Sequence, residues 1–291
     1  MGKMVRGWRV GVLAVVVAAM GLAAPAFAAD KSAEQIEASM LVTGNVDIET
    51  DGSLSQLQID KEQALPAGVV KFVRDNARHW KFEPVLRDGK AVQAQAPMRL
   101  RVVAKKLPDG SFQVGLRGVS FERYDANDPE LAVATVRGAP KYPVEAFRAG
   151  AAGTVYAVVK VGRNGRVEDA VAEQVNLRIL STDAEMRRLR RMFADATLSA
   201  LRDWRFRVPT QGENVDKPFW TVRIPVSYAI DGQPGESDYG TWVNYVPGPR
   251  ESLPWAEAAA RSSFAPDTLG EGGIYMADSH APRLLTPLQG G

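Results

Sequence analysis

Alternating apolar and polar positions predict two β-hairpins in separate parts of the chain. One occupies about residues 43–60 and turns at Asp51-Gly52, and the other occupies about residues 155–171 and turns at Asn164-Gly165. Asp-Gly and Asn-Gly are strong hairpin signals because both central residues of a type I′ turn need positive φ. We therefore expect two antiparallel ribbons of similar size.

A helix is predicted after each hairpin. Thr182 and Glu185 have the spacing of a capping box, in which an acid follows a hydroxyl N-cap three residues later. Pro66 fits the first turn of the other, shorter helix. Each helix carries an apolar stripe at helical spacing. The stripes are Val69, Val73 and Ala77 in the first helix, and Met186, Leu189, Phe193, Ala196, Ala200 and Leu201 in the second.

Both predicted helices run into the same pattern of a Trp, a basic residue and a Phe. The pattern occurs at residues 80–82 and 204–206, and a matched strand begins 18 residues after each Trp, at Met98 and Val222. We interpret this as two copies of one ββαβ unit, and hence as an α+β fold in which small antiparallel sheets pack on helices. Both Trp side chains are expected in the core, because a buried aromatic removes ~150–250 Å² from water. An exposed ring that stacks on a ligand is the alternative.

The N-terminus has the layout of a cleavable signal peptide. A positive stretch precedes a short apolar segment, residues 10–24, and a small-x-small cleavage site follows at residues 26–28. The apolar segment is shorter than the ~20 residues that a membrane-spanning helix needs. We therefore expect residues 1–28 to be removed on export, with an uncleaved anchor as the alternative.

Composition narrows the classes of function. Without Lys3, Arg6 and Arg9, the 36 basic residues of the chain fall to 33, against 34 acidic residues, so the mature protein has a net charge of −1. It then has no global positive field to attract nucleic acid. The chain contains no cysteine, which excludes disulfides, thiol catalysis and cysteine-ligated metals.

The sequence carries no signature of catalysis or cofactor binding. HExxH, GxSxG and P-loop patterns are missing, and the two histidines, His79 and His280, belong to no catalytic pattern. We therefore predict a protein that is not an enzyme and that needs neither a cofactor nor a metal. The densest charge cluster is interpreted as a solvated helix face, with a docking patch for an acidic partner or anionic lipid as the alternative. It consists of Arg187, Arg188, Arg190 and Arg191.

The second unit, about residues 139–230, resembles the C-terminal domain of the TonB family, whose members are periplasmic energy transducers of Gram-negative bacteria. The resemblance rests on an ordered set of motifs, which are Pro140-Lys141-Tyr142-Pro143 with Ala146, Gly153 and Val155, Asn164-Gly165-Arg166-Val167, Trp204-Arg205-Phe206 and Val222-Arg223-Ile224-Pro225-Val226. The first unit matches only the hairpin, the Trp-basic-Phe pattern and the last strand. It lacks a Tyr-Pro segment ahead of its hairpin.

The resemblance implies a way of binding partners. In the family, the last strand of the domain is a sheet edge that captures an extended peptide from an outer-membrane receptor by adding it to the sheet. Carried to this sequence, the partner-binding residues are Val222, Arg223, Ile224, Pro225, Val226, Ser227 and Tyr228, together with Tyr142 and Pro143. The expected partners are extended segments of outer-membrane or other envelope proteins, and not nucleic acid.

The pattern of this last strand is compatible with an edge. Apolar and polar residues alternate from Thr221 to Ile230, which predicts a half-buried strand. Pro225 cannot donate a backbone hydrogen bond, so its position is expected to face outward from the sheet. The alternative is an edge covered by the protein's own tail or by a second copy of the chain.

Departures from TonB shape the expected function. TonB keeps an N-terminal anchor that couples it to a proton-driven motor complex, and it has a long Pro-rich spacer. No anchor is expected here once residues 1–28 are removed, and only about a dozen residues, at most ~40 Å when extended, separate that point from the first predicted strand near Met40, too few for such a spacer. We therefore expect a soluble protein-interaction module in the periplasm of a Gram-negative bacterium, without a stable membrane anchor. One alternative is a self-associating structural envelope protein, a homodimer formed through edge strands. Another is a membrane-anchored energy transducer of the TonB type, if the N-terminal segment is not cleaved.

Four parts are predicted along the chain. They are a signal peptide at residues 1–28, a divergent TonB-like domain at 30–122, a TonB C-terminal-like domain at 135–230, and a Gly/Pro-rich tail at 231–291. The composition of the tail is typical of irregular chain. Its scattered aromatic residues nevertheless favour a tail that wraps onto the domains and reaches the edge strand.

Overall fold

The computed structural model describes residues 37–107, 109–231, 239–253, 255, 264–277 and 281–288. These residues belong to one compact unit, Ser32–Gly291. The predicted signal peptide, residues 1–28, lies outside the described ranges. Within those ranges, no helix combines the length and the apolar character needed to cross a membrane.

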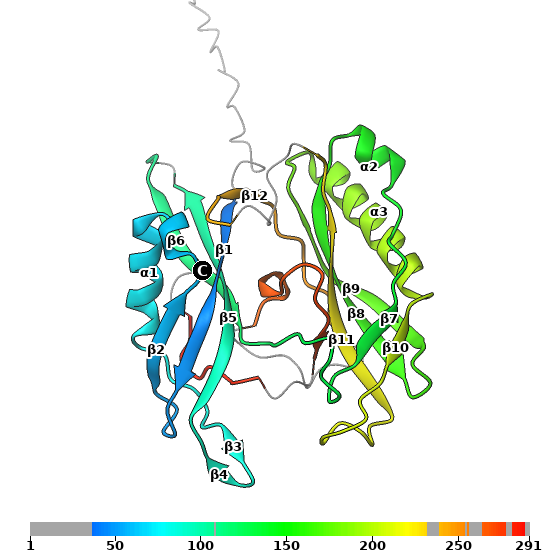
Figure 1. Cartoon of the computed structure of the whole chain (residues 1–291). Coiled ribbons are helices and arrows are strands. Elements are labelled where there is room, and N and C mark those ends of the chain that lie inside the picture. The colour runs from blue at the N-terminus through cyan, green and yellow to red at the C-terminus, as the bar shows by residue number, and fades with distance from the viewer. Residues whose placement is uncertain are drawn as a thin grey trace, which may run out of the picture. The chain divides into compact units, whose positions relative to one another are not determined.

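The first half of the chain forms an antiparallel sheet with a helix on one face (Figure 1). Its strands are β1 (Glu37–Ile48), β2 (Leu54–Ile59), β5 (Ala94–Lys106) and β6 (Phe112–Ser120), and the helix is α1 (Ala67–Ala77). β1 pairs with both β2 and β5, and β5 pairs with β6. Shorter elements are η2 (Glu62–Ala64) after β2, and the β3 (Leu86–Arg87) and β4 (Lys90–Ala91) ribbon before β5.

The predicted alternation builds the core of this half. Every second residue of β1 from Met40 to Ile48 is buried, and the predicted helix stripe of Val69, Val73 and Ala77 is buried in the same cluster. Trp80 joins this cluster with 3% of its surface exposed, so its predicted core position is confirmed.

The second half repeats the sheet-on-helix arrangement. Its elements are β7 (Val133–Val136), α2 (Val144–Arg148), β8 (Gly153–Gly162), β9 (Val167–Leu177), α3 (Asp183–Leu201), β10 (Arg205–Arg207) and β11 (Phe219–Tyr228). β8 lies between β9 and β11 in an antiparallel sheet, and α3 lies along one face of it (Figure 1). Thr182 caps α3 as predicted, because its hydroxyl accepts a hydrogen bond from the N–H of Glu185 at 3.3 Å. The predicted fold class, α+β with antiparallel sheets packed on helices, is confirmed.

The hairpin turns of both halves contact the Trp-basic-Phe segments in the same way. The N–H of Phe82 donates to the carbonyl of Gly52 at 2.8 Å, and the N–H of Phe206 donates to the carbonyl of Gly165 at 2.8 Å. The φ angles of the two glycines are 78° and 70°. A Cβ atom at Gly52 or Gly165 would lie 2.0 or 2.2 Å from the carbonyl oxygen of that Phe. Glycine is therefore required at both turns by conformation and by space.

Each Trp-basic-Phe segment also pairs with a second stretch of chain. In the second half, β10 pairs with β7, which precedes it in the sequence. In the first half, the partner comes from the C-terminal part of the chain. The backbone N–H of Glu83 donates to the carbonyl of Arg283 at 2.9 Å, and the backbone N–H of Leu285 donates to the carbonyl of Lys81 at 2.7 Å. Residues from the C-terminal end thus take, in the first half, the place that β7 takes in the second.

The tail contacts both sheets. β12 (Val243–Tyr245) pairs with β1, and the next residue, Val246, forms a bridge with Leu177 of β9. β13 (Tyr275–Met276) pairs with β11, and η4 (Pro266–Thr268) contacts β5, β6 and β11. The expectation that the tail wraps onto the domains is confirmed for its described residues.

The pKa of Asp51 should show whether its hydrogen bonds with Ser53 in the first hairpin turn form in solution. Its carboxylate accepts hydrogen bonds from the hydroxyl of Ser53 at 2.5 Å and from the N–H of Ser53 at 2.8 Å, and these bonds lower the pKa of Asp51 from 3.8 to about 2. Since the folded pKa is the lower one, the stabilisation is present above pH 3.8 and is lost as the pH falls through about 2. NMR titration of the carboxyl carbon should show Asp51 ionised at pH 3, and Ser53→Ala should raise its pKa. Equal midpoints near 3.8 in both proteins would contradict this.

Candidate partner-binding edge

The predicted binding strand, β11, lies next to the outer edge of its sheet. On the inner side it pairs with β8 along its whole length, from Phe219 to Tyr228. On the outer side β13 pairs only with Val222 and Arg223, and the N–H of Ala277 donates to the carbonyl of Thr221 at 2.8 Å. Of the residues that the structure describes, none forms a strand pair with the outer side of Ile224–Tyr228. Among the described residues, the tail thus pairs with the first part of this edge, and no strand pairs with the second part, which we call the open part although Ile224, Pro225 and Tyr228 are buried.

The backbone of β11 alternates between its two neighbours. Because the carbonyl of Thr221 faces β13, the backbone groups of Arg223, Pro225 and Ser227 face the same outer side. Pro225 therefore presents its nitrogen, which lacks a proton, to the edge, as the sequence predicted. The β13 ladder ends before this position, since Pro225 cannot donate the next hydrogen bond.

One face of the open part carries a cluster of aromatic rings. Tyr142 packs edge-to-face against Tyr228 at 5.4 Å and against Phe193 of α3 at 5.9 Å between ring centroids. The Tyr228 hydroxyl bonds with that of Thr197 at 2.9 Å, and the Tyr142 hydroxyl donates to the carbonyl of Ala151. Burial raises the pKa of both tyrosines, so their rings are neutral near pH 7. The structure therefore brings Tyr142 to the end of β11.

Exposed apolar side chains continue this cluster on α2. Pro143 is the N-cap of α2, and Val144 and Phe147 of this helix are 61% and 57% exposed. The ring of Phe147 packs edge-to-face on Tyr142 at 5.6 Å. Pro143 thus positions the helix, whereas Val144 and Phe147, which the sequence did not single out, offer the exposed apolar surface.

The opposite face of β11 differs from the prediction. The sequence predicted a half-buried strand, but Thr221 and Arg223 on the second face are also buried, at 3% and 6% exposure. Arg223 forms an ion pair with Glu173 of β9 at 2.9 Å, and Arg250 of the tail pairs with the same carboxylate at 2.6 Å. Phe264 of the tail lies under both guanidinium groups, 4.7 Å from Arg223 and 5.8 Å from Arg250. The tail covers this face, which no local pattern in the strand could reveal.

The hydroxyl of Ser227 on this second face is also in use. Arg178 donates to Ser227 at 3.1 Å and to Thr154 at 3.2 Å, and it forms an ion pair with Glu271 of the tail at 3.2 Å. The side chain of Ser227 is therefore fixed by the sheet, while its backbone groups face the edge.

The arginine cluster on α3 is only partly a solvated face. Arg187, Arg188 and Arg191 are exposed, whereas Arg190 is half-buried. Arg190 donates to the carbonyls of Val175 at 3.1 Å and Pro247 at 3.2 Å, and burial lowers its pKa. Arg190 thus holds the tail against β9, and the interpretation of the cluster as a solvated face was wrong for this residue.

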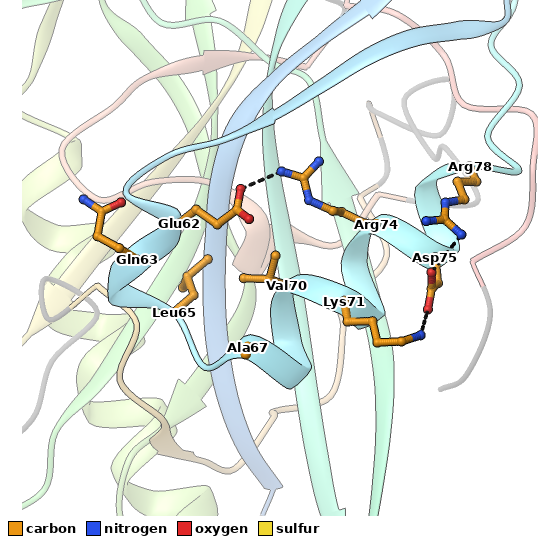
Figure 2. A pocket seen from close by; sticks show the side chains of 9 residues that line it. All are labelled: Glu62, Gln63, Leu65, Ala67, Val70, Lys71, Arg74, Asp75 and Arg78. Carbon is orange, nitrogen blue, oxygen red and sulfur yellow. Dashed lines mark hydrogen bonds and ion pairs between the residues drawn. The ribbon is translucent and has the colours of Figure 1, made fainter.

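A shallow hollow beside α1 offers no comparable site. Figure 2 shows its charged side chains turned toward one another. Arg74 pairs with Glu62 at 2.5 Å, and Asp75 pairs with Lys71 and Arg78 at 2.5 and 3.2 Å. These charges are satisfied within the chain. In the part of the chain that the structure describes, no group of three or more His, Asp or Glu side chains could hold a metal ion.

Comparison with known proteins finds relatives for one segment. Over 92 residues, the chain is 36% identical to Protein TonB from two strains of Xanthomonas campestris pv. campestris. The match covers 32% of this chain and 35% of TonB, so the chain spans about a third of the length of the curated relatives that it matches. No family model and no solved structure matches the chain. The resemblance drawn from the motifs is confirmed for one segment, and the chain contains a TonB C-terminal-like domain.

Proposed function

We propose that this protein is a non-enzymatic interaction module of the cell envelope that binds an extended segment of an outer-membrane or other transport protein. The segment adds as a strand to the outer edge of β11, mainly at Pro225–Tyr228, with Tyr142 and Pro143 beside it. The open part of the β11 edge carries the proposal, because its backbone groups have no strand partner among the described residues and such groups are a template for a further strand. The similarity to TonB supports the class of partner.

The proposal extends to location and to the first half of the chain. Residues 1–28 have the layout of a signal peptide, which supports export to the periplasm of a Gram-negative bacterium. The shared strand orders, β2-β1-β5 and β9-β8-β11, support descent of both halves from one duplicated unit. In the first half, however, β6 pairs with β5 from Arg99 to Lys106. We therefore assign partner binding to the second half alone.

The substitution Ser227→Pro tests the mechanism. It removes the N–H that faces the open edge and leaves the hydrogen bonds to β8, which come from the neighbouring residues. We expect about tenfold weaker binding of a synthetic peptide that corresponds to a periplasm-facing segment of an outer-membrane receptor, because one backbone hydrogen bond is lost and the ring obstructs the added strand. Isothermal titration calorimetry measures this.

Ser227→Ala is the matched control. It retains the backbone N–H and removes only the hydroxyl that binds Arg178 at 3.1 Å, so we expect peptide affinity within about twofold of the wild type. Peptide affinity that survives Ser227→Pro would refute edge addition. Failure of the wild type to bind any such peptide would refute the proposed function itself.

A second copy of the chain is the other occupant with structural support. β13 shows that an antiparallel strand fits on this edge. Light scattering distinguishes the two occupants. If the molar mass of the wild type doubles as its concentration rises, and the Ser227→Pro variant remains a monomer, self-association is favoured over binding of a foreign peptide.

A further inference from the structure

We propose that residues 264–277 are an intramolecular strand ligand of the β11 edge and compete with the partner for it. We call these residues the covering segment. They supply β13, which pairs with Val222 and Arg223, directly beside the open part of the edge. The part of this inference that concerns competition with a partner rests on the proposed function, because it describes the regulation of the same site. A partner that uses the full edge must displace the covering segment, whereas a partner confined to Pro225–Tyr228 binds beside it.

Side chains rather than backbone pairing hold the covering segment. Its two-residue ladder is too short to persist alone, since even a complete two-stranded ribbon is marginal in water. Phe264, at one end of the segment, lies against Arg223 and Arg250, whose charges both meet Glu173. Near the other end, Ile274 and Met276 are buried in the α3-side core of the second half.

The covering segment is also bound to the first sheet. Arg101 of β5, which is fully buried, donates to the carbonyl of Asp267 at 2.9 Å, and the carboxylate of Asp267 accepts from Tyr245. Arg99, also of β5, lies over the ring of Tyr275 at 5.3 Å. In the matched strands of the two halves, Arg99 and Arg223 occupy equivalent positions, and each stacks on an aromatic ring of the covering segment.

Two features make the covering segment releasable. Arg250 is 39% exposed, so water can replace its ion pair with Glu173 when the segment leaves. Pro225 prevents the ladder from extending along β11, so the only backbone pairing with β11 that displacement has to break is at Thr221–Arg223. A tethered strand has an effective concentration on the order of millimolar, so such a short ladder can weaken the binding of a free peptide without abolishing it.

Two substitutions release the covering segment by different means. Arg250→Ala removes a cation from the Glu173 cluster without altering β11. Gly273→Ala introduces a Cβ atom 2.3 to 2.6 Å from atoms of the Tyr275 ring, which forces Tyr275 out of its place. Arg283→Ala is the control, since it removes an exposed tail ion pair with Glu83 at 3.8 Å that lies away from β11.

The first measurement is amide hydrogen exchange of Ala277 in the full-length protein. Its N–H donates to Thr221 at 2.8 Å, so exchange requires the covering segment to leave. We expect exchange about tenfold faster or more in Arg250→Ala and Gly273→Ala, and unchanged exchange in Arg283→Ala. Rates equal to that of the control in both variants would overturn the proposal. Near-ultraviolet circular dichroism identifies any variant that has lost its fold.

The second measurement uses a labelled synthetic peptide of residues 270–277 as the probe. We expect at least about tenfold tighter binding to Arg250→Ala and Gly273→Ala than to wild type, because the edge is vacated. Equal affinity in all four proteins would overturn competition while leaving the proposed function intact. Another outcome is that peptides from outer-membrane receptors bind to none of the variants, although the amide of Ala277 exchanges faster. The proposed function is then refuted, whereas the role of the covering segment as an intramolecular strand ligand is supported.

Discussion

Replacing Gly165 with alanine should lower the free energy of unfolding by about 3 kcal/mol or more. An L-residue at a φ of 70° is strained by about 1–2 kcal/mol. The added Cβ atom would also lie 2.2 Å from the carbonyl oxygen of Phe206, so the backbone must move and the 2.8 Å hydrogen bond from Phe206 to Gly165 is lost. Urea denaturation followed by circular dichroism measures the change.

Gly89→Ala separates the two causes. Gly89 has a φ of 74°, almost the same as Gly165, yet no atom lies within 4 Å of the Cβ position. We expect Gly89→Ala to cost only the conformational part, about 1–2 kcal/mol. Gly52→Ala, whose Cβ atom would lie 2.0 Å from the carbonyl oxygen of Phe82, should behave like Gly165→Ala. Equal losses in Gly89→Ala and Gly165→Ala would show that the close contact with Phe206 is unimportant.

Glu173→Ala should cost about 3–5 kcal/mol of unfolding free energy, because it leaves the buried guanidinium of Arg223 without a counter-charge. The side chain of Glu173 is 1% exposed and that of Arg223 is 7% exposed, so solvent cannot replace the missing carboxylate at Arg223. Arg250 is more exposed and loses less. Thermal or urea unfolding measures the difference from the wild type.

Glu83→Ala is the appropriate comparison for this effect. Its carboxylate is 58% exposed and lies 3.8 Å from Arg283, so its loss should cost less than about 1 kcal/mol. A Glu173→Ala protein as stable as Glu83→Ala would mean that the two arginines find other partners, and the account of the Glu173 cluster would then be incorrect.

Local signals account for the part of the fold that the sequence predicted. Asp51-Gly52 and Asn164-Gly165 lie in the predicted hairpin turns, although only the glycine of each pair has a positive φ and neither turn is therefore type I′. Thr182 caps α3 through a contact only three residues away. The Trp-basic-Phe segments could be matched between the halves because each Trp precedes a matched strand by the same 18 residues. Such features are encoded within a few residues of chain.

Long-range pairing accounts for what the sequence did not predict. β13 meets β11 across about fifty residues, and the Glu173–Arg250 pair spans 77 positions. Neither contact produces a periodic pattern in the sequence, since a charged residue that pairs with a distant residue cannot be distinguished there from a charged surface residue. The tail aromatics were the available signal: they indicated that the tail is packed, but not that Phe264 lies on Arg223. The burial of Thr221 and Arg223 follows from this packing and was missed for the same reason.

The pairing of residues 283–285 with residues 81–83 determines when the first half of the protein can be completed during synthesis. In the second half, β7 precedes the hairpin and pairs with β10, so that half is assembled from consecutive chain. In the first half, the matching stretch has been supplied from the opposite end of the polypeptide. The pairing partner of the Trp-basic-Phe segment thus occupies different places in the chain order of the two halves, and the first half becomes complete only after synthesis of the chain has passed residue 285.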